Sequence, residues 1–187
     1  MAIGGLRAGV EPFVEQLAAP TATPGGGSAS AAAGAMAAGL AHMVAAMSRG
    51  KKNYLQYESE LSAAIARLAQ LREEFKAAID ADAESYDAVV KAYKHAKDTP
   101  DGAVTNALKG ATNLPLGVAE RAGEITRIVE RLRGVTNPRM ASDLTVAAAL
   151  ARAAVEGALA NVEINLESLS DEAFVREVRE KAASLRG

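Results

Sequence analysis

The stretch Pro20-Thr21-Ala22-Thr23-Pro24-Gly25-Gly26-Gly27-Ser28 separates a short N-terminal segment from a long run of small side chains. Two prolines and three consecutive glycines disfavour a helix interior and a paired strand, so we expect a loop whose backbone approaches other groups closely. Ser28 is a favoured N-cap residue for the alanine-rich helix that follows, and the free N–H groups of such a helix start favour anions. A flexible Gly/Ser linker is the alternative interpretation of this composition.

Composition limits the class of protein. The chain has 187 residues, a formal net charge of −2 and no cysteine. The length fits a single domain over residues 1–187, the charge argues against a nucleic-acid partner, and the lack of cysteine excludes disulfides and thiolate zinc sites. Residues 1–10 lack a signal-peptide pattern and no apolar run is pure enough to span a bilayer. We therefore expect a cytoplasmic protein without a membrane partner.

The residue types predict an all-α fold. Alanine, leucine, glutamate and arginine dominate, whereas β-branched and aromatic residues form no alternating runs. Apolar spacing and turn residues predict helices over about 10–18, 30–48, 57–97, 103–112, 113–133, 142–169 and 171–185.

The helix after the glycines has a side made of very small residues. They recur at three- and four-residue spacing: Gly27, Ala31, Gly34, Ala38, Ala41 and Ala45. Such a side lets another helix backbone come unusually close, so we expect this helix at the centre of the fold. Together with the polar exceptions described next, it favours a tight functional loop at residues 24–28 over a flexible linker.

Asp82 interrupts the apolar side of the helix over 57–97, between Ile79 and Tyr86. A carboxylate in that position must find partners or take up a proton, because burying it ionised and alone is very costly. Asp82 is therefore a candidate acid or base. The alternative is a structural aspartate that accepts hydrogen bonds from a neighbouring helix end or a tyrosine.

The helix over 142–169 carries Asp143, Asn161 and Asn165 on one face. Asp143 and Asn161 lie roughly 27 Å apart along its axis, at about 1.5 Å per residue, so they cannot meet in one site on one helix. Either they serve separate sites, or a two-fold partner brings the far end of its own helix alongside. The asparagines offer donors and acceptors for a ligand or for hydrogen bonds between helices.

Several common site motifs are missing from the sequence. His42 and His95 fall on different predicted helices without paired spacing, so we expect no metal site. The glycines are not followed by a lysine at P-loop spacing, and there is no G-x-S-x-G.

An ordered set of motifs resembles a known family. After Pro24-Gly25-Gly26-Gly27-Ser28 and the Ala/Gly helix come Gly50-Lys51-Lys52-x-Tyr54, Asp82-Ala83-x-x-Tyr86, Asn137 with Ser142-Asp143, and Asn161-Val162-x-Ile164-Asn165. From about Val10 to Leu169, the chain resembles the formiminotetrahydrofolate cyclodeaminase / methenyltetrahydrofolate cyclohydrolase family. The resemblance implies an up-and-down bundle of antiparallel helices that forms a homodimer, and no metal or redox cofactor.

The resemblance also implies a one-carbon tetrahydrofolate substrate. We expect hydrolysis of 5,10-methenyltetrahydrofolate to 10-formyltetrahydrofolate, because no formiminotransferase domain is attached here. The alternative is cyclodeamination of 5-formiminotetrahydrofolate, which releases ammonia, and a non-catalytic helical dimer is an explanation of another class.

The roles that the resemblance implies fall on a defined set of residues. Asp82 would be the acid or base, and Asp143 a second carboxylate whose charge a helix start stabilises. Lys51 and Lys52 would bind the acidic tail of folate, and the backbone of Gly25, Gly26, Gly27 and Ser28 a carboxylate. The remaining expected substrate contacts are Tyr86, Asn137, Asn161 and Asn165.

Overall fold

The computed structural model describes residues 5–96 and 102–186. Over these residues the chain forms α1 (Leu6–Ala18), α2 (Gly26–Ser48), the 3-10 turn η1 (Lys52–Tyr57), α3 (Glu58–Lys94), α4 (Ala103–Val135), the 3-10 turn η2 (Pro138–Met140), α5 (Ala141–Leu166) and α6 (Glu172–Leu185). The described residues include no β-strand, which confirms the predicted all-α class. The end of the predicted third helix at residue 97 lies outside the described part.

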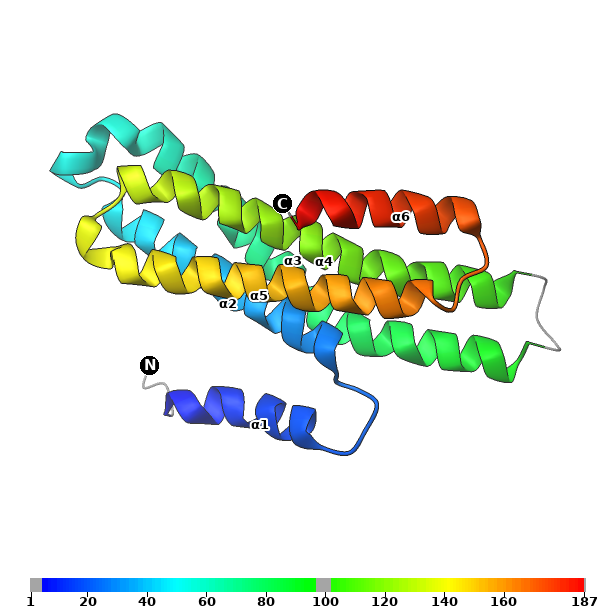
Figure 1. Ribbon diagram of the computed structural model, residues 1–187. Helices are drawn as coiled ribbons and strands as arrows, with labels where there is room; N and C mark the ends of the chain where they lie inside the picture. The colour runs from blue at the N-terminus through cyan, green and yellow to red at the C-terminus, as the bar shows by residue number, and fades with distance from the viewer. Residues whose placement is uncertain (1–4, 97–101, 187) are drawn as a thin grey trace.

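The long helices α2, α3, α4 and α5 lie side by side and run up and down in a bundle (Figure 1). α6 packs against α4 and α5, and α1 stands apart from the bundle beside α2 (Figure 1). The predicted bundle of long antiparallel helices is therefore confirmed.

α2 is the central helix, as its small side chains predicted, because it packs against α3, α4 and α5. Its small side brings the neighbouring helices too close for a larger residue. A Cβ added to Gly34 would lie 2.3 Å from Cε1 of Phe75 on α3, and one added to Gly157 on α5 would lie 2.4 Å from Oγ of Ser30. Phe75 is fully buried by this contact and is among the largest residues of the core.

The opposite side of α2 is apolar but uncovered. Met36, Met43 and Met47 are exposed there, and α2 carries no Asp, Glu, Lys or Arg over its whole length. Among the described residues, α2 and the segment Pro138–Leu166 are long and apolar enough to cross a membrane by length and composition alone, yet 44% of each apolar window is buried inside the bundle. Partial burial of this kind is typical of core helices in a bundle with one face still open.

The sequence predicted two helices where the structure has one. α4 runs without a break past residues 112 and 113, where one helix was expected to end and the next to begin, and it contains Pro115. Proline removes the N–H that would bond to the carbonyl four residues earlier, here that of Ala111. The Nδ2 of Asn165 on α5 donates to that carbonyl at 2.8 Å, so tertiary packing replaces the missing helical hydrogen bond.

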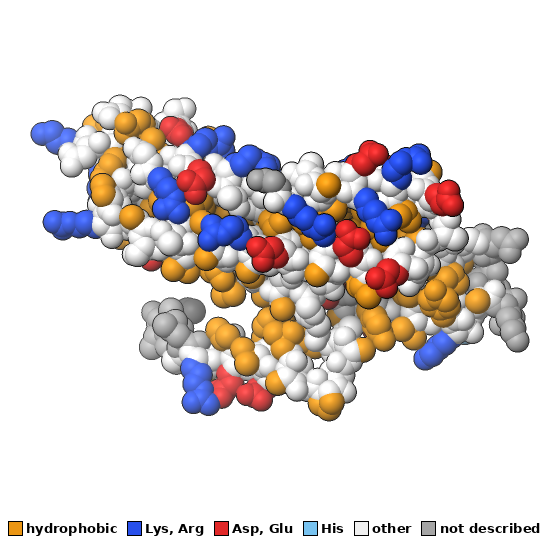
Figure 2. Space-filling view, viewed as in Figure 1, with side chains coloured by type: hydrophobic (Ala, Val, Ile, Leu, Met, Phe, Trp, Pro, Cys, Tyr) orange, Lys and Arg blue, Asp and Glu red, His pale blue; other side chains and the backbone are white. Residues whose placement is uncertain are grey.

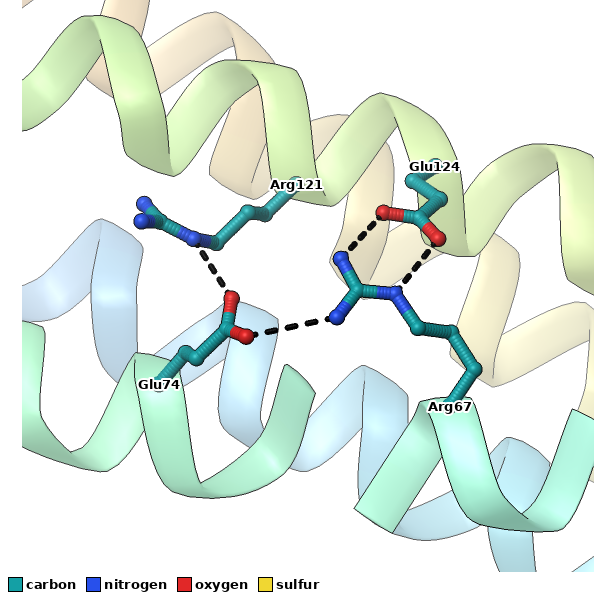
Figure 3. Close-up of polar contacts among 4 residues, drawn as sticks. All are labelled: Arg67, Glu74, Arg121 and Glu124. Carbon is teal, nitrogen blue, oxygen red and sulfur yellow. Dashed lines mark hydrogen bonds and ion pairs between the residues drawn. The ribbon is translucent and has the colours of Figure 1, made fainter. Parts of the chain in front are cut away.

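A chain of charges joins α3 and α4 on their outer side (Figure 3). Arg67 donates from Nε and Nη2 to the two carboxylate oxygens of Glu124, each at 2.7 Å. Nη1 of Arg67 lies 3.3 Å from Glu74, which also accepts from Nε of Arg121 at 2.7 Å. The hydrogen bonds from Arg67 hold the pKa of Glu124 below its usual range. All four side chains have charged partners within this network.

Candidate active site

A cleft of about 290 Å³ lies at one end of the bundle. Its walls come from the segment before α2, the first residues of α2, the last third of α3, the start of α4 and the end of α5. Gly25, Gly26, Gly27 and Asp82 all line it. The glycine loop therefore forms a wall of the cleft that holds the candidate carboxylate, which supports the tight-loop interpretation over a flexible linker.

Asp82 is held at the start of α2 by one of its two oxygens. The backbone N–H of Ser28 donates to Oδ2 at 2.8 Å, and the Ser28 hydroxyl lies 3.1 Å from the same oxygen. Oδ1 accepts no hydrogen bond from any residue that the structure describes. A half-buried carboxylate is thus fixed by the positive end of a helix, with its second oxygen left for a ligand.

Ser28 does not have the role that the sequence predicted. α2 begins at Gly26 with Gly25 at the N-cap position and no side-chain cap, so the expected Ser28 N-cap is wrong. Ser28 is fully buried, and its hydroxyl lies 2.9 Å from the carbonyl oxygen of Ile79 on α3 as well as near Asp82. The glycines let the helix begin early, which turns the serine toward α3 to bind the aspartate.

Gly27 is required by the position of Asp82. A Cβ at residue 27 would lie 2.0 Å from Oδ1 of Asp82, far inside van der Waals contact. The backbone of α2 therefore approaches the carboxylate as only glycine allows. The structural alternative, in which Asp82 accepts hydrogen bonds from a neighbouring helix end, matches the contacts of Oδ2 with Ser28.

Two tyrosines stand along the cleft on α3. Tyr86, expected from the sequence, and Tyr93, which the site prediction missed, both line it and are about half exposed, 46% and 53%. They are seven residues apart, close to two helical turns, so their side chains leave the same side of α3. That spacing, counted onward from Asp82 and Tyr86, was the signal that could have identified Tyr93. Exposed aromatic faces beside a carboxylate suit a flat organic ligand.

Asn161 and Asn165 line the cleft from α5. Nδ2 of Asn161 donates to the carbonyl oxygen of Gly157 at 2.8 Å, and Asn165 donates to Ala111. Asn165 thus makes the hydrogen bond between helices that was one of its two predicted roles. Within the described part of the chain neither Oδ1 accepts a hydrogen bond, so both side-chain oxygens are free acceptors at the cleft.

The other predicted site residues lie at the opposite end of the bundle. Lys51 and Lys52 follow the last residue of α2, and the backbone N–H of Asn137 donates to Ser48 Oγ at 3.1 Å. Asp143 is in the first turn of α5, which begins at this end. Since α2 is roughly 34 Å long at about 1.5 Å per residue, one chain does not bring these residues to the Asp82 cleft. No group of three or more His, Cys, Asp or Glu side chains among the described residues could hold a metal ion.

The fold and the cleft together define a helical-bundle protein with a cleft at one end, lined by a carboxylate that Ser28 holds in place. Comparison with known proteins identifies the family. The family model for formiminotransferase-cyclodeaminase matches residues 9–184, and the chain belongs to this family.

Relatives from both branches of the family are similar to this chain. It is 35% identical to the methenyltetrahydrofolate cyclohydrolase of Methylorubrum extorquens, covering 90% of this chain and 84% of that protein. It is 34% identical to the formimidoyltransferase-cyclodeaminase of Sus scrofa over 92% of this chain, but spans only 33% of that longer protein. The crystal structure of formiminotetrahydrofolate cyclodeaminase from Thermotoga maritima superposes with a TM-score of 0.88 at 32% identity, over 95% of this chain and 87% of that one.

Proposed function

We propose that this protein is an enzyme of one-carbon folate metabolism that hydrolyses 5,10-methenyltetrahydrofolate to 10-formyltetrahydrofolate. The observation that carries the proposal is Asp82, which lines the cleft and is fixed through Oδ2 at the start of α2, while Oδ1 accepts no hydrogen bond from the described residues. Support for the hydrolytic branch comes from the cyclohydrolase relative, of which this chain covers 84%. The Thermotoga maritima neighbour favours cyclodeamination of 5-formiminotetrahydrofolate as the second candidate.

In this mechanism Oδ1 of Asp82 is the general base that takes a proton from water. The methenyl carbon carries a delocalised iminium cation, which a fixed carboxylate stabilises electrostatically. Oδ1 accepts a proton from the attacking water as the new C–O bond forms. The bond from that carbon to N5 then breaks, the remaining hydroxyl proton goes to N5, and the formyl group stays on N10. The proton taken by Asp82 is released to solvent. In the second candidate, the same group donates a proton to departing ammonia.

The other cleft residues bind the substrate. Tyr86 and Tyr93 offer aromatic faces for the flat rings of folate. The free oxygens of Asn161 and Asn165 accept hydrogen bonds from the amino and ring N–H groups of a pterin. The reaction so written requires no metal or redox cofactor, and we propose a cytoplasmic enzyme without a membrane or nucleic-acid partner.

The second group of site residues joins the cleft in a homodimer. α2 begins at the Asp82 end and α5 begins at the Asp143 end. A two-fold axis that lies between the two uncovered faces and runs perpendicular to the helices sets the Asp143 end of one copy beside the Asp82 end of the other. In this arrangement Lys51 and Lys52 bind the acidic tail of folate, while Asn137 and Asp143 complete the site. Asp143 contributes negative charge near the iminium.

The absorbance of methenyltetrahydrofolate distinguishes the candidate functions. Purified protein added to methenyltetrahydrofolate removes its absorbance if the protein is a cyclohydrolase. Growth of the same absorbance from 5-formiminotetrahydrofolate identifies a cyclodeaminase. If neither signal changes, the non-catalytic helical dimer is the better explanation and the enzymatic proposal is wrong.

Mixing two inactive variants tests the shared site. Asp82→Asn and Asp143→Asn each remove one carboxylate from both sites of a homodimer. In a random mixture of the two, half of the dimers are mixed and each mixed dimer keeps one intact site, so about 25% of wild-type turnover returns. If the mixture stays as inactive as the separate variants, the two carboxylates do not serve one site across the dimer.

A further inference from the structure

α1 has an apolar side that its own chain leaves uncovered. Val10 and Val14 are 56% and 50% exposed, and Phe13 and Leu17 on the same side are only half-buried. In Figure 1 the helix stands off from α2, and Figure 2 shows an open slot between the N-terminal half of α1 and the bundle, with hydrophobic side chains on both of its walls. An isolated helix of this length is marginal in water, so α1 requires a partner for its apolar side.

The bundle offers a matching surface. On α2 it consists of the exposed Met36, Met43 and Met47. On α5 the surface continues through the exposed Val146 and Ile164. Val146 is 11 residues before Gly157 and Ile164 is 7 residues after it. Both separations are close to a whole number of helical turns, so the three residues lie on the same side of α5. Gly157 packs against α2 at Ser30, so the two helices present one continuous apolar surface, which we call the α2–α5 face.

We propose that two copies of this chain exchange their N-terminal helices, so that α1 of each copy packs on the α2–α5 face of the other. The open slot between α1 and the bundle of each copy is then filled by helices of the partner copy. The inference rests on the homodimer proposed above and adds which segment is exchanged.

The area fits a stable dimer. α2 and α5 are roughly 34 and 39 Å long, and side by side they are about 20 Å wide. Their shared face thus measures on the order of 700 Å², and one side of α1 adds about 200 Å². A standard stable interface buries about 800 Å² from each partner. α1 folded back on its own bundle would cover only a fraction of this face, whereas a two-fold exchange covers both copies of α1 and both faces together.

The charges favour a second copy over a lipid surface. Helices that lie on membranes typically carry several Lys or Arg beside the apolar side. α1 carries Arg7, which is paired with Glu11, and a further Glu15. α2 has no Lys or Arg. The α2 part of this face has no Asp, Glu, Lys or Arg, and the charges of α1 sum to a negative value. Such surfaces are better suited to a second protein surface than to an anionic lipid surface.

The exchange has a consequence for the cleft. Ala22 and Thr23 line it and belong to the segment that connects α1 to α2. When α1 docks on the partner, this segment is held at both ends, and one wall of the substrate site is fixed. Loss of α1 docking should therefore raise KM more than it lowers kcat.

Sedimentation of two matched variants tests the interface. Val10→Glu/Val14→Glu places two charges on the apolar side of α1, and Ala8→Glu/Gln16→Glu places two on its opposite side. Because all four residues are exposed in the single chain, neither variant disturbs the fold of the monomer. The first should weaken dimerisation on the order of 100-fold or more, from burial of charge, and the control by less than about 3-fold. Equal effects would overturn the proposal.

Disulfide trapping shows which chain α1 covers, because the natural sequence has no cysteine to interfere. One chain carries Val14→Cys, and a second, of different mass, carries Cys at Met36, Met43 or Met47 in turn. Exchange predicts a disulfide between the two different chains on mixing and oxidation. The double variant should likewise give a linked dimer. A disulfide within a monomer, or no disulfide at any of the three positions, contradicts the exchange.

The outcomes separate this inference from the function. Sedimentation and trapping require no turnover, so they stand whether or not the protein acts on folates. A wild-type monomer that binds anionic vesicles overturns both the dimer and the exchange. A wild-type dimer without linkage between chains overturns the exchange alone.

Discussion

Two places on α3 hold acidic side chains in opposite ways. Near its middle, Glu74 and Arg67 share a network with Arg121 and Glu124 in which every charge has a charged partner (Figure 3). Further along, the hydrogen bonds that Asp82 accepts from the described residues come from Ser28, which is uncharged, and they reach one oxygen.

The difference separates carboxylates that join two helices from the carboxylate that we propose as the catalytic group. A carboxylate whose two oxygens both accept hydrogen bonds from arginines is held in place by those charges, and here it joins α3 to α4. A carboxylate fixed by one oxygen at a helix start, with the other at a cleft, is preorganised for a substrate. Acidic side chains on the same helix therefore differ in role because they have different hydrogen-bond partners.

Neutralising Asp82 and Glu74 in turn should give the largest difference in turnover between the two places on α3. Asp82→Asn keeps the shape of the side chain and its contact with Ser28, but it removes the base, so turnover should fall on the order of 10³-fold. Glu74→Gln should leave turnover within about 2-fold, because Glu74 acts only within a surface network. Steady-state assays and circular dichroism of both variants measure this, and near-normal turnover by Asp82→Asn would remove Asp82 from the mechanism.

The close approach of α2 to Asp82 should be the next most sensitive feature. Gly27→Ala places a methyl group against Oδ1 and should lower the free energy of unfolding by about 1–3 kcal/mol while impairing turnover. Gly39→Ala on the same helix meets no atom within 4 Å and should instead stabilise by about 0.5–1 kcal/mol. Chemical denaturation of the two variants gives the comparison, and a Gly27→Ala protein as stable as Gly39→Ala would show that the backbone has room to move.

Asn165 combines the two roles, since it lines the cleft and satisfies the carbonyl freed by Pro115. Asn165→Ala should cost about 1–3 kcal/mol of stability, because the Ala111 carbonyl loses its donor. In a Pro115→Ala background the restored N–H takes over, so the same change should cost about 1 kcal/mol less. A double-mutant cycle in urea measures the coupling, and a coupling of zero would mean that water replaces the amide without loss.

The smallest effect belongs to the charged network. A double-mutant cycle of Arg67→Ala and Glu124→Ala should give a coupling of about 1 kcal/mol at pH 7, since both side chains are about one-third exposed. Arg67 lowers the pKa of Glu124 from 4.5, so the coupling is complete above pH 4.5 and disappears as pH falls through the lower folded value. Added salt should also reduce it, and coupling that is unchanged in acid would contradict the ion pair.

Much of the fold was predictable because its signals are local. The all-α class and the central position of α2 follow from helix-forming residue types and from small residues at helical spacing. Asp82 was identified because a charge in an apolar pattern stands out in the sequence. The continuity of α4 through Pro115 was missed, because the donor that satisfies the freed carbonyl is 54 residues away at Asn165.

The sequence by itself determined the all-α class, the central position of α2 and the choice of Asp82 as the candidate carboxylate, since each depends on near neighbours along the chain. Only the tertiary structure decided that Ser28 binds Asp82 instead of capping its own helix, and that Tyr93 joins the cleft. It alone separated Asp143 from Asp82 at opposite ends of the bundle. Those features depend on distances between helices, which are set by how closely the glycines of α2 allow α3 and α5 to pack.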